Sequence, residues 1–485
     1  LNMSEITNEF KRSKNMIERP THNSLEYKTT VRPHFLDKPS DQIIDPYVYD
    51  IICQYVPKQE IDDHLLYTRS LYTLQGHYHN LWSYDKVVEL DRPQNHLLNL
   101  AIESTRYAFK LEQPVETLSF DDLRSVPYIN SSAAGYGYYG KKGDTNNINV
   151  AVKRAVRFIR EYQDGLPFDN TRYTPDLAFT RTQLGLRTNP KIRHVWGKAF
   201  HNILIEGICA SPLINEYSKG QHPITTGIHV YKRLPSLIQS IFNEREQMYA
   251  YGIDIKSFDP TPQPWMIELA FDILEENLSF KSQTEKDCFD YSKYFFIHTP
   301  VVMPDGRLWI KHLGVPSGSY FTQLIDSIVN HIVLNYIQLR IWGTTFKTYV
   351  LGDDSLFSVP YIDRCPLDTI ATIGMELHFV IHPDKCIATE DPREVEFLGH
   401  FERAGRIWRP HHKSLRLALF PEHPVLSPDE SVTRLKGICI DTGMNNWQLL
   451  RLMTDAVRIF GSGTHSWAKE DANFIASVLR VQTAP

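Results

Sequence analysis

The stretch Tyr349-Val350-Leu351-Gly352-Asp353-Asp354-Ser355-Leu356-Phe357 places two adjacent carboxylates at a glycine turn between two apolar runs. The pairs Val350/Leu351 and Leu356/Phe357 predict the two short strands of a hairpin, with Gly-Asp as its turn. Such a tip holds the carboxylates at one rigid point, where they repel each other unless a cation lies between them. One or two carboxylates, completed by substrate phosphates, are the usual protein environment of Mg²⁺. Taken alone, the stretch is equally open to being a solvated acidic turn.

A second segment, upstream, also ends in carboxylates: Tyr251-Gly252-Ile253-Asp254-Ile255-Lys256-Ser257-Phe258-Asp259. Its apolar residues alternate with Gly252, Asp254 and Lys256, which predicts a strand with Asp254 on the face opposite the apolar set. Three prolines then end the strand, and residues 265–274 follow with helical spacing. Asp254 beside Asp353 predicts a carboxylate pair that holds two metal ions about 3.5–4 Å apart for in-line phosphoryl displacement. The alternative for Asp254 is a strand-end cap.

A Pro/Gly loop between these segments, Gly314-Val315-Pro316-Ser317-Gly318, runs into a predicted helix that continues to about Arg340. Polar residues recur along one face of this helix at i, i+3, i+7 and i+11, namely Ser319, Thr322, Asp326 and Asn330. A polar stripe is often only a solvated face. Because this one follows a Ser-Gly loop and lies between two carboxylate strands, we interpret it as a surface that contacts substrate.

The three segments, in this order, resemble the palm motifs of a viral RNA-dependent RNA polymerase of the right-hand type. The matching residues are Asp254-x4-Asp259, Ser317-Gly318-x3-Thr322-x3-Asp326-x3-Asn330 and Gly352-Asp353-Asp354. The resemblance extends to a fingers motif that admits the template (131–142), a basic fingertip strand (191–193), a lysine segment (382–385) and a hairpin that grips the growing strand (395–401). The amino-acid sequences of several motifs most resemble those of polymerases from partitiviruses, which have small segmented double-stranded RNA genomes.

The resemblance implies an α+β fold with fingers, a palm built on an antiparallel RRM-like sheet, and a helical thumb. It also implies a closed ring in which the fingertips contact the thumb. The expected bounds are 1–245 for the N-terminal region and fingers, 246–265 for the first palm strand, 266–310 for a return to the fingers, 311–415 for the rest of the palm and 416–485 for the thumb. Within these regions we expect a helix over 367–375, a hairpin turn at 403–406, a capping box at Ser427–Glu430 with proline at the first helical position, and an amphipathic helix over 447–458.

The site residues follow from the chemistry of phosphoryl transfer, which depends on positioning and electrostatic stabilisation. Asp254 and Asp353 are the expected ligands of Mg²⁺, for which Mn²⁺ can substitute. Asp354 is expected as an auxiliary ligand, because adjacent strand positions point to opposite faces. Lys385 is the expected general acid toward the leaving pyrophosphate, with a surface lysine as its alternative.

The incoming nucleotide is expected to contact two groups of residues. Lys191 and Arg193, two apart on an extended strand, face the same way and clamp the β- and γ-phosphates, with Arg181 as a weaker third candidate. The sugar and base side is assigned to a polar set made of Asp259, Ser317, Gly318, Thr322, Asp326 and Asn330. Position 326 departs from the family pattern, because polymerases of positive-strand viruses usually carry Asn there.

The ribose 2′-hydroxyl distinguishes RNA from DNA because it both donates and accepts a hydrogen bond. Asp259, five residues after Asp254, is placed to reach the sugar, and Thr322 and Asp326 complete the set. Reverse transcriptases, which resemble this palm, carry an aromatic steric gate near this point and a Tyr-x-Asp-Asp turn. We therefore expect a strong preference for ribonucleotides.

Composition agrees with a large globular chain: 485 residues, 42% hydrophobic, with a net charge of −5. Basic charge is local, since residues 141–193 hold eleven Lys/Arg against five Asp/Glu, as in a funnel that steers phosphates. The six cysteines are scattered without C-x2-C spacing, which predicts a reducing compartment. No apolar run approaches 20 residues and no signal peptide is visible, so no membrane partner is expected. Met3 is the expected initiator.

The expected partners are an RNA template and product duplex, ribonucleoside triphosphates and, as an implication of the family, a viral capsid protein. The expected location is the host cytoplasm, inside the virion. Two alternatives stay open at this point. One is a two-metal RNA nuclease or phosphotransferase that uses the same carboxylates. The other is a catalytically decayed, RNA-binding polymerase fold, because a fold alone does not prove activity.

Overall fold

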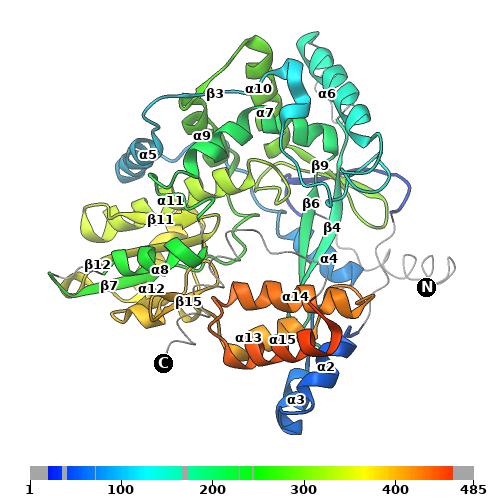
Figure 1. Ribbon diagram of the computed structural model, residues 1–485. Coiled ribbons are helices and arrows are strands. Elements are labelled where there is room, and N and C mark those ends of the chain that lie inside the picture. Colours follow the sequence, from blue (N-terminus) through cyan, green and yellow to red (C-terminus); the bar gives the residue numbers. More distant parts are fainter. Residues whose placement is uncertain are drawn as a thin grey trace.

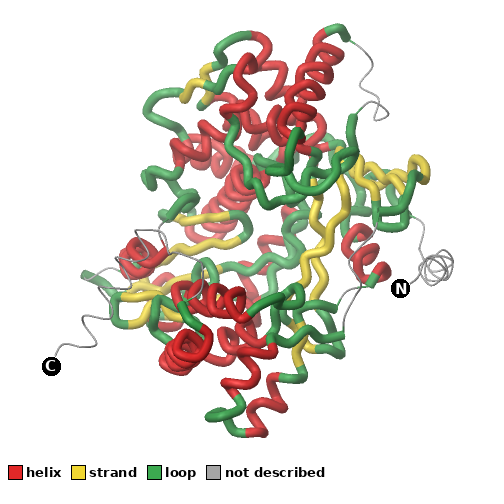
Figure 2. The backbone as a smooth tube through the Cα atoms, turned by 45° about the vertical axis from the view of Figure 1, so that its right-hand side comes forward, coloured by secondary structure: helices red, strands yellow, loops and turns green. Residues whose placement is uncertain are grey.

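The computed structural model describes residues 20–34, 41–71, 73–165, 173–228, 230–242 and 245–462. Helices gather in the upper part of the molecule, a sheet lies to one side below them, and a second group of helices closes the lower part (Figure 1). Two long strands, β4 (Asp176–Gln183) and β6 (Lys191–Gly197), run between the upper and lower parts, and the same path is visible after a 45° turn (Figure 2).

The four-stranded sheet that carries the acidic segments is antiparallel throughout, in the order β11-β12-β7-β13. Its strands are β7 (Met248–Gly252), β11 (Thr348–Leu351), β12 (Asp354–Pro360) and β13 (Ile387–Thr389). The predicted hairpin is confirmed, since Leu351 pairs with Asp354 and Gly352-Asp353 form the turn. The antiparallel sheet predicted for the palm is thereby present.

The first acidic strand is shorter than its alternation predicts. β7 ends at Gly252, where it pairs with Ile387 of β13. Beyond it the chain continues extended against another segment, with a bridge between Ile255 and Ile381. The alternation of burial still holds, because Ile253 and Ile255 are buried while Asp254 is exposed. Asp254 therefore lies just past the strand end, between two neighbouring segments of the sheet.

A five-stranded mixed sheet, in the order β1-β10-β9-β4-β6, carries the basic fingertip strand. Its members are β1 (Leu25–Thr30), β4 (Asp176–Gln183), β6 (Lys191–Gly197), β9 (Thr299–Val302) and β10 (Arg307–Lys311). β4 and β6 pair antiparallel with Arg181 opposite Arg193. Two small pairs join distant parts of the chain: β2 (Tyr67–Thr68) with β5 (Gly185–Leu186), and β3 (Val115–Glu116) with β8 (Leu278–Ser279).

The main hydrophobic core lies between the four-stranded sheet and the upper helices. The upper helices are α5 (His96–Phe109), α6 (Asn147–Gln163), α7 (Phe200–Tyr217), α9 (Pro264–Glu276), α10 (Gln283–Ile297) and α11 (Thr322–Trp342), and α12 (Leu367–Gly374) joins the same core from beside the sheet. The helices predicted after residue 264, from the Ser-Gly loop and over 367–375 are α9, α11 and α12. α11 begins at Thr322, so Ser319 of the predicted polar stripe lies in the loop before the helix and not on it. Of the other three, Asp326 and Asn330 are buried and Thr322 is partly buried.

The remaining elements of this half surround the sheets. α4 (Leu74–Trp82) packs on the five-stranded sheet, and α8 (Val230–Ser240) packs on the hairpin β14 (Phe401–Arg403) and β15 (Arg406–Trp408). Arg403 pairs with Arg406, as predicted for this turn. The short helix η4 (Pro383–Lys385) carries the lysine segment.

The lower helices are α13 (His411–Leu419), α14 (Pro428–Asp441) and α15 (Trp447–Phe460). Ser427 caps α14 by accepting from the Glu430 amide, but the Glu430 carboxylate accepts from the Leu426 amide, so the capping box is displaced by one residue. These helices share a buried cluster with α2 (Pro46–Ile52), next to α3 (Lys58–His64). Leu184, beyond the end of β4, packs against the same cluster, which joins the end of this strand to the buried cluster of α2 and the lower helices.

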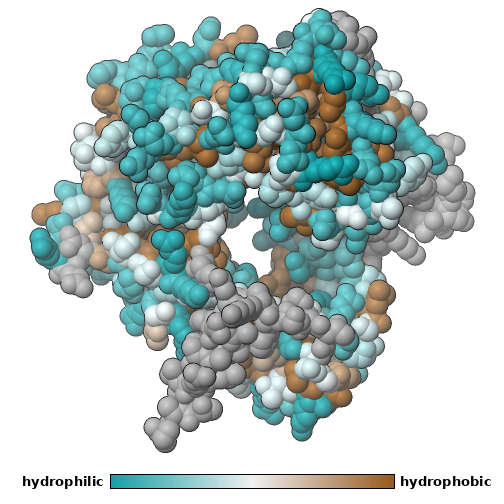
Figure 3. Space-filling model, turned by 45° about the horizontal axis from the view of Figure 1, so that its top comes forward, coloured by the Kyte–Doolittle hydropathy of each residue, from teal (hydrophilic) through white to brown (hydrophobic). Residues whose placement is uncertain are grey.

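The space-filling view shows an opening through the middle of the molecule, with hydrophilic surface on much of its rim (Figure 3). In Figure 1 the acidic hairpin (β11 and β12), the basic fingertip strand (β6) and the lower helices (α13, α14 and α15) lie on different sides of the molecule. Among the described residues, no helix has the length and apolar content needed to cross a bilayer.

Candidate active site

The acidic turn is held at the end of the four-stranded sheet by its own backbone and by α11. Gly352 has φ +61°, a conformation that a side chain disfavours, and this lets the chain reverse directly before Asp353. The Gly352 amide donates to the Ser327 hydroxyl at 2.9 Å. Asn330 Nδ2 donates to the carbonyls of Gly352 at 3.1 Å and Asp354 at 3.4 Å. Helix α11 thus fixes the position of the turn that carries both carboxylates.

Asp254 reaches the same place from β7. Its amide donates to the Cys386 Sγ at 3.2 Å, and its carbonyl accepts from the His382 amide at 3.3 Å. The Asp254 charge contributes to the raised pKa values of both Asp353 and Asp354, so Asp254 lies within electrostatic range of the turn. The predicted convergence of the two acidic segments is therefore present in the fold.

The electrostatics of the turn favour a bound cation. The surrounding protein desolvates Asp353 and raises its pKa, an effect that the Arg193 charge opposes. Desolvation, then the charges of Asp353, Glu396 and Asp254, raise the pKa of Asp354 to about 6. Like charges held this close are stabilised when a divalent ion neutralises them.

A second carboxylate pair, Asp259 and Asp326, lies deeper in the site. Asp326 is 5% exposed, and burial together with the Asp259 charge raises its pKa well above the ordinary value. Burial also raises the pKa of Asp259, which hydrogen-bonds to Asp326. Two carboxyls in contact disfavour ionisation of each other, which agrees with the raised pKa of both groups. Within the described part of the chain, Asp326 Oδ1 has no hydrogen-bond partner, so this pair keeps an unused polar oxygen.

The basic fingertip faces these carboxylates. Lys191 and Arg193 are exposed on β6 while Ile192 between them is half-buried, which agrees with the predicted common face. The Arg193 charge acts on Asp259, Asp353 and Asp354, and in each case it opposes the rise in pKa that burial causes. Arg181 lies opposite Arg193 in the adjacent strand and is exposed. A cation row thus borders the acidic centre.

The Ser-Gly loop lies between β6 and α11. Trp196 donates its amide to the Ser317 hydroxyl at 3.3 Å, and Thr322 donates its hydroxyl to the Pro316 carbonyl at 2.6 Å. A Cβ at Gly318 would lie 1.8 Å from the Trp196 carbonyl oxygen, so only glycine fits there. The loop is therefore built on the strand that carries Arg193. Asn330, predicted on the same substrate surface, is fully buried beneath the turn, and its nucleotide contact stays a prediction.

Lys385 ends η4 and is exposed, one residue from the Cys386 that contacts Asp254. The predicted template motif forms a loop closed by bonds such as Lys142 amide to Ser132 carbonyl at 2.9 Å. Tyr139, in that loop, is 94% exposed and adjoins the exposed Lys141. An exposed ring beside a cation suits base stacking with phosphate contact.

The side chains at the acidic turn offer carboxylate oxygens as possible metal ligands. Across the described residues, no three His, Cys, Asp or Glu side chains are grouped so as to hold a metal ion by themselves. Carboxylate oxygens are nevertheless the right ligand type, and Mg²⁺ commonly completes its shell with water and phosphate oxygens. The residues present are therefore compatible with a metal that arrives with the nucleotide.

The profile of the family described as viral RNA-dependent RNA polymerase matches residues 44–454, which is most of the chain. The chain belongs to this family. The match includes every palm motif and the fingertip strand, and it confirms the resemblance that these motifs predict. Viral RNA-dependent RNA polymerases generally use divalent metal ions, in agreement with the carboxylates described above.

Curated relatives in this family come from viruses. The chain is 38% identical over 245 residues to the RNA-directed RNA polymerase of Cryptosporidium parvum virus 1 (strain KSU-1), covering 49% of this chain and 44% of that protein. It is 30% identical over 346 residues to that of Atkinsonella hypoxylon virus (isolate 2H), covering 57% of this chain and 51% of that protein. The chain thus spans about half the length of the curated relatives it matches.

Solved viral RNA-dependent RNA polymerases share the fold. The enzyme of a human picorbirnavirus superposes with a TM-score of 0.69 at 16% identity, covering 90% of this chain and 88% of that one. Sicinivirus 3Dpol gives a TM-score of 0.70 at 13% identity, covering 94% and 100%. The expected right-hand polymerase fold is confirmed.

Motif reasoning missed several residues that shape the polymerase site. Ser327 and Cys386 hold the backbones of Gly352 and Asp254, and nothing in their local sequence marks them. Tyr84 donates its hydroxyl to the Val315 carbonyl at 2.8 Å, from a part of the chain with no assigned motif. Glu206 was detectable, because it is a lone carboxylate inside the otherwise apolar run Ile203–Ala210.

Proposed function

We propose that this protein synthesises RNA on an RNA template by two-metal nucleotidyl transfer, as the transcriptase and replicase of a double-stranded RNA virus. The observation that carries the proposal is the meeting of Asp254 and Asp353 at one end of the antiparallel sheet, opposite Arg193. Membership of the viral RNA-dependent RNA polymerase family supports the same reaction. The two viral relatives described above, both RNA-directed RNA polymerases by name, agree with it.

Asp254 and Asp353 are the residues that would hold Mg²⁺ or Mn²⁺, with Asp354 as an auxiliary ligand. The metal, when bound, activates the attacking hydroxyl and neutralises charge on the transferring phosphoryl group. The protein side supplies position: α11 holds the turn through Asn330 and Ser327, while Cys386 steadies Asp254.

The triphosphate is bound by the fingertip cations, Lys191 and Arg193, with Arg181 alongside. Planar guanidinium groups suit bidentate contact with phosphate oxygens. Lys385 delivers a proton to the leaving pyrophosphate oxygen, and its exposed position near Asp254 is compatible with this role. The nucleotide is supported from the α11 side by Ser317, Gly318, Thr322 and Asn330.

The ribose is read by the pair Asp259 and Asp326. The raised pKa values of the two carboxyls support a proton held between them, and such a pair would both donate and accept, which matches the 2′-hydroxyl. The acid at position 326 takes the place of the Asn usual in positive-strand viruses. A proton shared by the two carboxyls would supply the hydrogen-bond donor that the Asn side-chain amide supplies in those viruses.

The proposal extends to partners and location. The template strand enters past the exposed Tyr139 and Lys141 and pairs with product inside the central opening (Figure 3). Packing of Leu184 against the buried cluster that α2 shares with the lower helices supports a closed ring. A capsid protein as partner, and the interior of a virion in the host cytoplasm as location, follow from the resemblance to partitiviruses.

The test is incorporation of labelled ribonucleotides on a single-stranded RNA template with Mg²⁺ or Mn²⁺. Wild type is expected to make template-length RNA, and Asp353→Asn to lose at least about 10³-fold in rate, because the substitution removes a charge that acts on the transition state. Asp363→Asn, an exposed carboxylate beyond the far end of β12, is the matched control and is expected to retain full rate.

The same assay separates the alternatives. A two-metal nuclease would shorten the template, and a decayed polymerase fold would bind RNA without making or cutting it. Equal product from wild type and Asp353→Asn would contradict the placement of the metal.

A further inference from the structure

Glu206 is a buried carboxylate whose position links the fingers to the Ser-Gly loop. It lies in α7 and is 4% exposed, among neighbours such as Leu204, Ile205 and Ile208 that are fully buried. A carboxylate is stable in such surroundings only when its oxygens receive hydrogen bonds or a nearby cation. The partners of Glu206 therefore indicate what it does.

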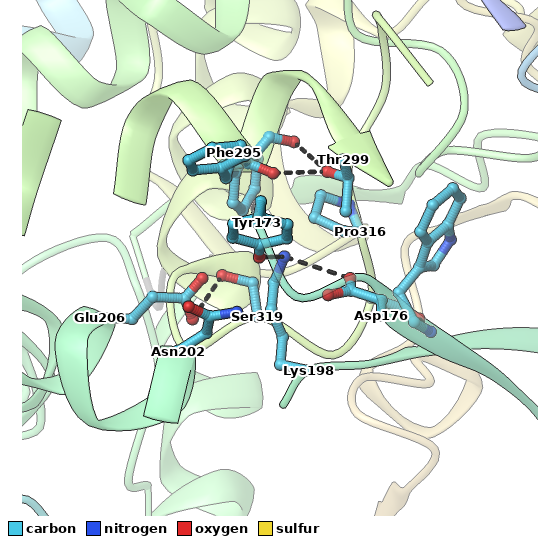
Figure 4. A network of polar contacts seen from close by, with 12 residues as sticks. Tyr173, Asp176, Lys198, Asn202, Glu206, Phe295, Thr299, Pro316 and Ser319 are labelled. Atoms are coloured by element: carbon cyan, nitrogen blue, oxygen red, sulfur yellow. Dashed lines mark hydrogen bonds and ion pairs between the residues drawn. The ribbon is translucent and has the colours of Figure 1, made fainter. Parts of the chain in front are cut away.

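Both hydrogen bonds that Glu206 accepts come from the loop between β10 and α11. Its Oε2 accepts from the Tyr320 amide at 2.8 Å and from the Ser319 hydroxyl at 3.1 Å. Figure 4 shows Glu206 and Ser319 pointing toward each other beside Asn202 and Lys198. One carboxylate oxygen thus ties down the two residues that directly follow Ser317–Gly318.

The opposite side of the loop rests on the fingertip strand. Ser317 accepts from the Trp196 amide, and Gly318 fits only because it has no Cβ against the Trp196 carbonyl. Trp196 lies three residues after Arg193 on β6. The loop is consequently held between α7, through Glu206, and the strand that carries the proposed triphosphate clamp.

We propose that Glu206 is a positioning residue, which holds the Ser317–Tyr320 loop against the fingertip strand so that the loop and Arg193 receive the nucleotide in one fixed geometry. This inference rests on the proposed function for the nucleotide contact itself. The holding of the loop by Glu206 does not depend on it.

The charge state of Glu206 is set by the polar groups packed around it from several elements. Burial, with a contribution from Asp176 on β4, raises its pKa to about 7, while Lys198 and the two loop donors oppose the rise. Lys198 is itself paired with Asp176 at 3.2 Å and lies near the Tyr173 hydroxyl (Figure 4). Tyr291 on α10 is a further neighbour, and Lys311 on β10 acts on Lys198 and Asp176. The carboxylate therefore changes charge in the neutral range.

The sign of the pH effect follows from the hydrogen bonds. Below about pH 7 Glu206 is neutral, and above it the residue is charged. Hydrogen bonds to an ionised acceptor are roughly twice as strong as bonds to a neutral one. The two loop bonds lower the pKa of Glu206, so detachment of the loop with Glu206 still buried takes up a proton, and the loop is held more firmly at pH 8 than at pH 6. Global unfolding has the opposite sign, because the pKa of Glu206 is raised overall in the folded protein, so exchange is compared under conditions where local opening dominates.

Hydrogen exchange of the segment 315–322 in the full-length protein measures this holding without any catalysis. After correction for intrinsic exchange, wild type is expected to show greater protection at pH 8 than at pH 6. Glu206→Gln, neutral at every pH, is expected to keep the lower protection at both. Glu206→Ala is expected to reduce protection about ten-fold at pH 8, since a hydrogen bond to a charged group contributes on that order.

The matched control is Glu285→Gln. Glu285 is also buried and also accepts from one amide, that of Phe120, and from one serine hydroxyl, that of Ser282. It does not contact the Ser-Gly loop through either bond, so its substitution is expected to leave the exchange of 315–322 unchanged. Ser319→Ala removes one of the two bonds from the loop side and tests the same link if a substitution at position 206 prevents folding.

Nucleotide incorporation gives the second readout. Glu206→Gln is expected to raise the KM for ribonucleotides at pH 8 several-fold while RNA affinity stays unchanged, and to lack the wild-type change of KM between pH 6 and pH 8. Exchange and KM profiles identical to wild type in Glu206→Gln and Glu206→Ala would overturn the inference. An inactive wild type with the predicted exchange pattern would refute the proposed function and leave the positioning role of Glu206 standing.

Discussion

At the scale of single residues, we expect the pair Asp259 and Asp326 to decide which sugar is accepted. Asp259→Ala is expected to lower the preference for ribonucleotides over deoxyribonucleotides about ten- to a hundred-fold, because one hydrogen bond to the 2′-hydroxyl is lost. The measurement is the ratio of kcat/KM for the two substrates. Asp326→Asn keeps a group that donates and accepts, so it is expected to retain the preference. If Asp259→Ala kept the wild-type preference for ribonucleotides over deoxyribonucleotides, Asp259 would not be the residue that contacts the sugar.

Lys385 is the other residue whose role can be isolated. Lys385→Leu is expected to slow single-nucleotide addition about 10²–10⁴-fold with little change in nucleotide affinity, as for loss of a general acid. Rapid-quench kinetics measure the step directly. Lys413→Leu, at an exposed lysine on α13, is the control. An intact addition rate in Lys385→Leu would show that another group protonates pyrophosphate.

At the scale of elements, α11 and the acidic hairpin act as one unit. Asn330→Ala leaves the carbonyls of Gly352 and Asp354 without their side-chain donor, so the free energy of unfolding is expected to fall by about 1–3 kcal/mol. The apparent affinity for Mg²⁺ in the polymerase assay should weaken with it, because the turn positions Asp353.

Asn335→Ala is the control for this prediction. Asn335 is equally buried on α11 and accepts from the Ser104 hydroxyl at 2.7 Å, away from the turn. Urea unfolding is expected to show a loss of stability for both variants, and metal titration a change for Asn330→Ala alone. An equal effect of both variants on metal dependence would mean that α11 acts only through overall stability.

At the scale of the whole molecule, the N-terminal region and the thumb are joined around Asp45. This buried carboxylate accepts from the Tyr47 and Val48 amides of α2, and from Ser431 and Arg434 of α14, each of the latter at 2.7 Å. Asp45→Ala is expected to lower the free energy of unfolding by about 3 kcal/mol, because it leaves Arg434 without its partner.

Thermal unfolding and limited proteolysis of the lower helices measure this effect. Cleavage within 411–460 is expected to become faster in Asp45→Ala as α2 separates from the thumb cluster. Asp50→Ala, an exposed position on the same helix, is expected to change stability by less than about 0.5 kcal/mol. Protection of the thumb in Asp45→Ala equal to wild type would show that the apolar cluster alone holds the two parts together.

Much of the palm could be predicted because its signals are local. The Gly352-Asp353 turn, the long α11 and the hairpin at Arg403–Arg406 each follow from residues adjacent in sequence. The early end of β7 could not, because pairing with β13 and with Ile381 decides it. Domain bounds and the chemical roles of the site residues stay predictions, since neither follows from the pattern of helices and strands.

The sequence by itself determined the kind of chemistry: the ordered carboxylates, the basic fingertip and the Ser-Gly loop are specific enough to place the chain among viral RNA-dependent RNA polymerases. Only the tertiary structure decided how those groups are held and charged. Asn330 supports the turn from a buried position, the pKa of Asp326 is raised by burial and by the neighbouring Asp259, and Glu206 anchors the loop from α7. Hydrogen-bond partners and pKa values depend on desolvation and on neighbours distant in sequence, and folding alone brings these together.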